Sequence, residues 1–250
     1  MSENWWKVEN LKKEEAKVRS SKISELNIKG DFGSYRKVLK TDNLEDSMLE
    51  YHNDLDSKSK LLQINNLLDI SPRKKFKILD VGCGMGFTTF QIKNIFRKST
   101  VVGVDISSDA TSYAKKKFTE CEFICQGIEP ENKIIDEFDL IYCFEFYPFT
   151  RTNDWNIHDQ YIEYFLKNLK IDGLLIINHH WNNKNSLSHN YLQLNNKYQV
   201  KLYNLISKKL YHLKSFVPLF ILSLIDRLIK NLRKAEDKIC VIKKSGIKNA

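Results

Sequence analysis

Short apolar runs alternate along this chain with longer stretches in which apolar residues recur at helical spacing. Four such runs lie at Ile78–Val81, Val101–Val104, Phe138–Cys143 and Leu169–Ile177. Each run is short enough for a buried strand, and the stretches between them are long enough for helices. The alternation therefore predicts an α/β fold with a mostly parallel sheet that carries helices on both faces.

The 250 residues suit one generous α/β domain with appendages. Residues 1–52 are polar and include Trp5 and Trp6, which predicts a helical appendage that closes as a lid or only docks on the domain. The domain itself is expected over residues 53–250 and begins with a helix that ends near Ser71-Pro72. Its core motifs occupy 76–181, and residues 182–250 are predicted to form a C-terminal hairpin with a helical insertion before the last strand.

A glycine-rich turn follows the first apolar run. Gly82, Gly84 and Gly86 stand at every second position, where they let the backbone turn sharply from a strand into a helix. They also let a ligand approach the main chain without a Cβ in the way. The second run ends in Asp105, whose carboxylate offers two oxygens to the vicinal hydroxyls of a ribose. Turn and acid together predict a nucleoside site.

Two details of this turn favour S-adenosylmethionine over a dinucleotide. A dinucleotide-binding turn has the pattern Gly-x-Gly-x-x-Gly, whereas here the third glycine comes one residue early and Phe87 takes its place. Asp80 adds a carboxylate at the floor of the loop. That charge would repel a pyrophosphate and attract a cationic sulfonium or amino group.

At these residues the chain resembles the class I S-adenosylmethionine-dependent methyltransferases. The resemblance spans about residues 60–180 and rests on four ordered motifs, Leu79–Gly86, Gly103–Ser107, Phe138–Cys143 and Leu169–Ile177. It implies a seven-stranded, mostly parallel sheet, S-adenosylmethionine as the cofactor and methyl transfer as the reaction. The residues predicted to bind the cofactor are Asp80, Gly82, Cys83, Gly84, Gly86, Asp105, Ile106, Gly127, Ile128 and Phe144.

The loop after Phe138–Cys143 is a candidate acceptor site, because ligands of an open parallel sheet gather at the carboxyl ends of its strands. Relatives that methylate exocyclic or amide nitrogens often carry Asn-Pro-Pro-Tyr here, and this chain keeps only Tyr147. Glu145 matches an acid of small-molecule relatives that orients the acceptor, or it satisfies a loop backbone. Arg151 is predicted to grip a phosphate or carboxylate, with a plain surface arginine as the alternative.

Histidines stand at the end of the predicted fifth strand. His179 and His180 are candidate general bases for a hydroxyl acceptor, and alternation along the strand turns only one of them toward the site. We favour His180, against a structural hydrogen bond at the strand end. Trp181 and His158 are further candidates for acceptor contact. A third ligand at zinc spacing is missing from the pattern, and no metal is predicted.

Composition adds little beyond this. The 40 basic and 31 acidic residues give a formal charge of +9, which fits a nucleic-acid or membrane partner or a solvated lysine-rich surface. An aromatic-basic nucleic-acid motif is absent. The five cysteines show neither metal spacing nor a disulfide framework and are expected to be buried, reduced thiols. With no signal-peptide pattern at the start, the sequence predicts a cytoplasmic protein.

One apolar stretch, Leu213–Leu232, has no place in the motifs. Its most apolar part, residues 216–225, has ten residues, which are too few to span a bilayer, and Asp226 and Arg227 end it. Three interpretations remain open: a buried helix, a surface between copies of the chain, or a helix lying on a membrane. Basic residues toward the end of the stretch support the third interpretation, a peripheral membrane contact through 213–234.

The sequence thus predicts an S-adenosylmethionine-dependent methyltransferase. The expected reaction is O-methylation of a small, anionic metabolite or of a sugar or phosphate-type precursor, for example in cell-surface polysaccharide modification. The alternatives are an RNA or protein methyltransferase, for which the basic charge would be the footprint. A catalytically silent subunit that acts through a partner is a further alternative.

Overall fold

The computed structural model of the chain describes residues 57–131, 136–180, 186–206, 208–211, 213, 216–233 and 237–244. The predicted appendage over 1–52 lies outside these residues. The strands are β1 (Lys77–Val81), β2 (Thr100–Asp105), β3 (Glu122–Cys125), β4 (Phe138–Phe144), β5 (Leu169–His180), β6 (Val200–Asn204) and β7 (Asp237–Lys243).

Helices connect these strands. A helix over residues 57–68 precedes β1, at the place where the sequence predicts one. The others are α4 (Phe87–Ile95), α5 (Ser108–Lys117), α6 (Tyr147–Arg151), α7 (Trp155–Lys167), η2 (Leu187–Asn190), α8 (Tyr191–Lys197), α9 (Lys208–Tyr211) and α10 (Leu219–Arg233). Since α9 and α10 lie between β6 and β7, the predicted helical insertion before the last strand is confirmed.

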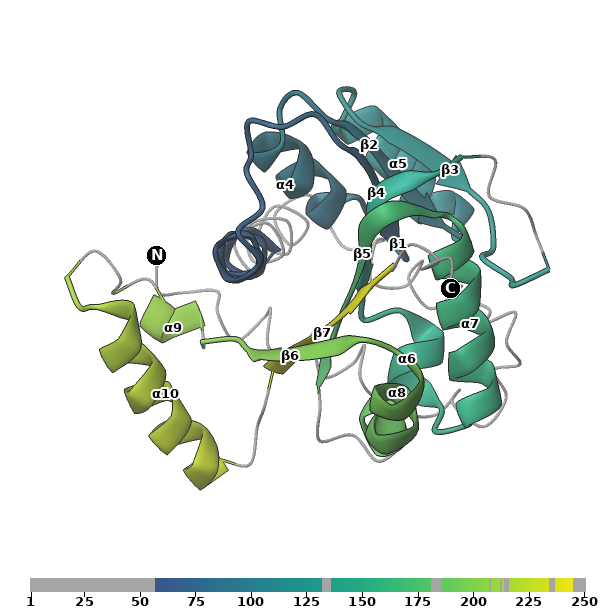
Figure 1. The fold of residues 1–250 in the computed structure, drawn as a ribbon. Helices are drawn as coiled ribbons and strands as arrows, with labels where there is room; N and C mark the ends of the chain where they lie inside the picture. The colour runs from purple at the N-terminus through teal and green to yellow at the C-terminus, as the bar shows by residue number, and fades with distance from the viewer. Residues whose placement is uncertain are drawn as a thin grey trace.

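The described strands form one sheet in the order β3-β2-β1-β4-β5-β7-β6 (Figure 1). The first five strands pair in parallel, and β7 runs antiparallel to both β5 and β6. This is the seven-stranded, mostly parallel sheet that the sequence resemblance implies. The antiparallel pair of β6 and β7 confirms the predicted C-terminal hairpin.

Each face of the sheet has its own apolar core. On one face, Leu79, Val81 and Ile177 pack with buried residues of α7 such as Phe165. On the other, Ile78 and Ile176 pack with residues from the helix over 57–68 and from α4. Alternate residues of β1 and β5 therefore enter opposite cores, as a sheet covered on both faces requires.

The helix over 57–68 is tied to the C-terminal part of the domain. Leu61 and Ile64 are fully buried. The side-chain amide of Gln63 donates to the carbonyl of Ile206 at 3.0 Å and accepts from the backbone N–H of Ile206 at 2.8 Å. These paired bonds fix the helix against the segment that follows β6, 143 residues further along the chain.

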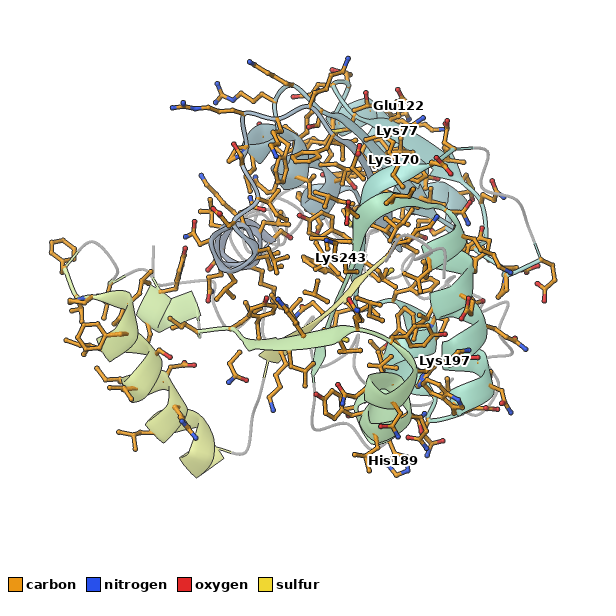
Figure 2. All side chains as sticks on the ribbon, viewed as in Figure 1. Lys77, Glu122, Lys170, His189, Lys197 and Lys243 are labelled. Atoms are coloured by element: carbon orange, nitrogen blue, oxygen red, sulfur yellow. The ribbon has the colours of Figure 1, made fainter. Side chains whose placement is uncertain are left out.

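The two edges of the sheet differ in what they carry. Figure 2 shows Lys77, Glu122 and Lys170, which lie at or near the starts of β1, β3 and β5, at the same edge. The loops that follow β1, β2 and β4 leave from the opposite, carboxyl edge. In an open parallel sheet that edge is where ligands bind.

The cysteine prediction needs a correction. All five thiols are free, but only Cys83, Cys143 and Cys240 are buried, whereas Cys121 is half-buried and Cys125 is exposed. Cys125 ends β3 near the border of the sheet, where fewer neighbouring elements cover it. Within the described ranges no helix combines the length and apolarity needed to cross a membrane.

Candidate functional site at the carboxyl edge of the sheet

The glycine turn after β1 has the backbone that its sequence predicts. Gly82, Gly84 and Gly86 have φ values of 72°, 52° and 84°, in the left-handed region that favours glycine. A Cβ added at Gly86 would lie 2.8 Å from the Cβ of Ala114, which explains the need for glycine there. At Gly84 an added Cβ would meet nothing within 4 Å. The turn is therefore open to a ligand at Gly84.

Asp105 at the end of β2 holds this turn. Its Oδ2 accepts a hydrogen bond from the amide of Gly84 at 2.9 Å, and its Oδ1 accepts from the amide of Ser107 at 2.8 Å. Burial raises the pKa of Asp105, although the two amide donors act in the opposite direction. Since a carboxylate has about four acceptor positions, both oxygens keep capacity for the hydroxyls of a ribose.

Asp80 lies beneath the turn and is buried. The hydroxyl of Thr89 donates to its Oδ2 at 2.6 Å. The pKa of Asp80 is raised from 3.8 to about 7, chiefly because the carboxyl group is buried; the nearby charge of Asp105 adds to the rise, and the bond from Thr89 opposes it. A cation bound above the turn would stabilise the ionised form of Asp80.

These observations fit the cofactor implied by the resemblance. The open side at Gly84 and the remaining acceptor capacity of Asp105 suit a ribose. The carboxyl groups of Asp80 and Asp105 suit a ligand that carries positive charge. The described residues show no group of three or more side chains that could hold a metal ion.

The other residues predicted to bind the cofactor surround the same loops. Ile106 is exposed directly after Asp105, and a Cβ at Gly127 would lie 3.4 Å from the Cδ1 of Ile106. The carbonyl of Ile128 accepts from the hydroxyl of Tyr161 at 3.1 Å, which anchors the loop after β3. Burial raises the pKa of the Cys83 thiol, which keeps it uncharged. Phe144, at the end of β4, is half-buried against the core.

Strand register brings these loops together. Val81 pairs with Val104 of β2 and with Cys143 of β4. Further along the sheet, Phe144 at the end of β4 pairs with Asn178 of β5. The segments that follow β1, β2 and β4 therefore leave the sheet at one level.

A second polar group lies where β4 and β5 end. Glu145 has a φ of 53°, which is strained for a residue with a side chain, and its side chain is exposed. Its backbone N–H donates to the carbonyl of Asn178 at 2.9 Å. The buried side chain of Asn178 donates to the carbonyl of Lys238 at 3.1 Å and accepts from the ammonium of Lys60 at 3.1 Å.

Lys60 and Asn178 form a contact that sequence reasoning missed. They are 118 residues apart, and Lys60 belongs to the helix that precedes β1. The contact brings a positive charge to Asn178 near the end of β5, the residue whose carbonyl accepts from the backbone of Glu145. Because the side-chain amide of Asn178 is neutral, its bond to Lys60 does not compensate the charge of the ammonium.

The remaining acceptor candidates are placed by their backbone alone. Tyr147 and Arg151 are the first and last residues of α6. His179 and His180 end β5, where the register pairs them with Lys238 and Asp237 of β7. Because residues two apart share a face of a strand, position 180 lies on the same face as Asn178. Trp181 lies outside the described residues.

His158 differs from its predicted role in acceptor binding. It is fully buried in α7, and its Nε2 lies 2.7 Å from the carbonyl oxygen of Pro148. Its Nδ1 accepts from the side-chain amide of Asn190 at 3.1 Å. Both ring nitrogens are thus used inside the protein, and burial lowers the pKa of His158. This geometry gives His158 a structural function and no free nitrogen for an acceptor.

A surface cavity of about 510 Å³ lies elsewhere, between α7, the end of α8 and the end of β7. Figure 2 shows Lys197 and Lys243, which contribute to its wall. Lys197 pairs with Asp159 at 2.7 Å and Lys243 with Asp172 at 2.8 Å. In the sheet, Lys243 lies in register with Leu174, in the first half of β5. The cavity is therefore near the amino end of β5 and remote from the glycine turn, which lies at the carboxyl ends of the strands.

Comparison with protein families agrees with this geometry. Residues 72–236, more than half of the chain, match the family described as "Methyltransferase domain". Residues 8–127 also match the family described as "Protein-L-isoaspartate(D-aspartate) O-methyltransferase".

Similar curated proteins share part of the chain. A malonyl-[acyl-carrier protein] O-methyltransferase of Acetivibrio thermocellus is 29% identical over 113 residues, which cover 44% of this chain and 38% of that protein. The protein of the same name from Priestia megaterium is 39% identical over 80 residues, 31% of this chain and 29% of that protein. The chain thus matches well under half the length of these relatives.

Solved structures show a similar fold over nearly the whole chain. The plantazolicin methyltransferase BpumL, in complex with a pentazolic desmethylPZN analog and SAH, aligns with a TM-score of 0.55. The alignment covers 95% of this chain and 99% of that one, at 17% identity. A likeness at this identity concerns the fold.

Proposed function

The chain belongs to the methyltransferase domain family, and on this premise we propose that it transfers a methyl group from S-adenosylmethionine to an oxygen of a small anionic molecule. S-adenosylmethionine supplies a methyl group activated by its bond to a cationic sulfur. The protein then has to bind the cofactor, align the acceptor with it, and accept the proton of a hydroxyl acceptor.

Cofactor binding is assigned to the glycine turn and its two acids. Asp105 receives the ribose hydroxyls while it also holds the turn through Gly84. The opening at Gly84 lets the ligand lie against the main chain. Asp80, below, favours the positive charge of the cofactor once it is ionised.

The position of Lys60 carries the proposal of an anionic acceptor. Its ammonium bonds the neutral side chain of Asn178 at 3.1 Å, next to the strained, exposed Glu145. An ammonium has three donors, and two remain for a carboxylate or phosphate of the acceptor. Arg151, in the helix after β4, is proposed as a second anion-binding residue.

His180 is proposed as the general base, with His179 and Glu145 as the other candidates. Imidazole titrates near neutral pH and so accepts a proton from a hydroxyl as its oxygen is methylated. Position 180 shares the face of β5 on which Asn178 meets Lys60. A carboxylate acceptor is already ionised at neutral pH and needs no base.

The named activity of the curated relatives supports transfer to oxygen. Both are malonyl-[acyl-carrier protein] O-methyltransferases, and a malonyl group ends in a carboxylate. The class of small anionic acceptors includes carboxylates, phosphates and acidic sugar precursors of cell-surface polysaccharides. The name of these relatives therefore supports a carboxylate as the acceptor group within this class.

Transfer of labelled methyl from S-adenosylmethionine to cell extract, fractionated into small molecules, RNA and protein, tests this proposal. We expect label in the small-molecule fraction, released by mild base if the product is an ester and retained if it is an ether. Label in RNA or protein alone would replace the proposed acceptor class. Cofactor binding without transfer to any fraction would favour a silent subunit that acts through a partner.

A further inference from the structure

Helix α10 stands apart from the rest of the domain. It lies at the far side of the molecule from α7, beside the short helix α9 (Figure 1). The apolar stretch 213–232, for which the sequence leaves three interpretations open, contains most of this helix. The exposed fractions of the side chains of α10 distinguish a buried helix from a helix that lies on a partner or on a membrane.

The apolar side of α10 is only partly covered. Leu222 and Asp226, four residues apart, are buried and mark the side that faces the protein. Phe220, Leu224 and Leu228, also spaced by four, are 68%, 57% and 66% exposed. They form one ridge along the helix, which we call the α10 ridge. A buried core helix would not leave such a row of large apolar side chains in water.

The ridge is extended at its start by Phe216, which precedes the helix and is 86% exposed. Leu219, the first residue of α10, is half exposed as well. An aromatic side chain at the end of an apolar ridge is typical of segments that enter the boundary between lipid headgroups and acyl chains.

The charges around the ridge are basic. The one acid within α10 is Asp226, and it is buried. Arg227 is exposed beside the ridge, one residue before Leu228. The chain as a whole carries a formal charge of +9. The exposed side chains that the structure describes on α10 therefore carry positive and no negative charge, which complements an anionic partner.

We propose that α10 docks on an anionic lipid surface, with the α10 ridge and Phe216 inserted among the headgroups. Apolar insertion and electrostatic attraction add in such binding. The helix has 15 residues, which suits lying in the interface and is too short for a span. A second copy of the chain carries the same formal charge of +9, and this like charge opposes association of the two copies.

Flotation with vesicles tests this proposal on the full chain. Vesicles of phosphatidylcholine with about one-third phosphatidylglycerol are compared with vesicles of phosphatidylcholine alone. We expect binding to the anionic vesicles that is lost in high salt, because a Debye length near 3 Å at 1 M screens the basic residues. The triple variant F220S/L224S/L228S should bind about tenfold less or weaker still.

A matched control comes from another exposed apolar residue. Leu192 belongs to α8 and is 75% exposed, and Figure 1 shows α8 apart from α10, with β6 running between the two helices. The variant Leu192→Ser should bind vesicles as the unmodified chain does. Cofactor affinity of each variant, measured by calorimetry, shows that the fold is kept.

Equal binding of the triple variant and the unmodified chain to anionic vesicles would overturn the proposal. So would an absence of vesicle binding together with a dimer, seen by sedimentation, that the triple variant abolishes. That second result would assign the α10 ridge to a second copy of the chain. Neither outcome bears on methyl transfer, which is measured separately.

Discussion

The Oδ2 atom of Asp105 lies 2.9 Å from the amide nitrogen of Gly84. This bond joins the end of β2 to the glycine turn after β1. The acid proposed to bind the ribose therefore also sets the shape of the glycine turn, against which the rest of the cofactor is proposed to lie. Loss of its carboxylate should affect both.

Replacement of Asp105 by Ala should weaken S-adenosylmethionine binding by about 1–3 kcal/mol, or about 5- to 150-fold. The melting temperature should fall as well, because the amides of Gly84 and Ser107 lose their acceptor. Calorimetry and thermal unfolding measure the two effects. Asp105→Asn keeps one acceptor oxygen, and its cofactor affinity and melting temperature should lie between those of the unmodified chain and the Ala variant. An Ala variant with unchanged cofactor affinity would refute the ribose assignment.

Asp80 should make the ligand-free protein less stable as pH rises. Its pKa is 3.8 in an unfolded chain and about 7 when folded. Between these values the folded state holds a proton that the unfolded state has lost, and the free energy of unfolding falls as pH increases. The full effect above pH 7 is about 4 kcal/mol.

The variant Asp80→Asn stays uncharged and should lack this slope. Relative to the unmodified chain, it should therefore gain stability from pH 5 to pH 8 in chemical denaturation. Its cofactor affinity at pH 8 should fall, because the attraction between the carboxylate and the cationic ligand is gone. An unchanged stability difference across this range would mean that the pKa of Asp80 is not raised.

Lys60→Met should weaken binding of the acceptor and leave the affinity for the cofactor unchanged. Loss of a charged hydrogen bond costs about 1.5–3 kcal/mol, which should raise the KM for the acceptor identified by labelling at least about tenfold. Lys58 is exposed on the same helix, and Lys58→Met is the matched control. Equal KM values for the two variants would remove Lys60 from the acceptor site.

His180→Ala should lower turnover of a hydroxyl acceptor about 100-fold or more, with cofactor affinity kept. The acid limb of the pH–rate profile should disappear along with the imidazole. Steady-state kinetics across pH 5 to 9 gives both readings. A fully active variant would exclude His180 as the base and turn attention to His179 and Glu145.

His158→Ala should affect folding instead. Removal of a buried ring that bonds both Pro148 and Asn190 should cost about 2–4 kcal/mol of unfolding free energy. Because burial lowers the pKa of His158, its contribution is present above about pH 6.5 and is lost as pH falls through the folded value. Denaturation at pH 7.5 and at pH 5 measures this difference. A stable variant with impaired acceptor binding would restore the role predicted from the sequence.

The sequence predicts the cofactor side of the site better than the acceptor side. The glycine turn and Asp105 follow directly from local patterns, since an apolar run, glycines and a terminal acid define one βαβ unit. The contact between Lys60 and Asn178 joins residues 118 positions apart, and local periodicity carries no information about such a pair. His158 shows the same limit, because its burial depends on Pro148 and Asn190 from other segments.

The same reasoning applies to α10. Its apolar residues at helical spacing predict a helix in the insertion before β7, and the structure confirms it. Amphipathic spacing alone shows that one side is apolar, but not what covers that side. The exposed fractions of Phe220 and Leu224 provide that information.

Titration of the unmodified chain with S-adenosylmethionine tests the central claim most directly. We predict saturable binding at one site per chain, which S-adenosylhomocysteine competes for and Asp105→Ala weakens. A folded protein that shows no heat of binding and no thermal stabilisation by either compound would contradict the assignment of the glycine turn as the cofactor site.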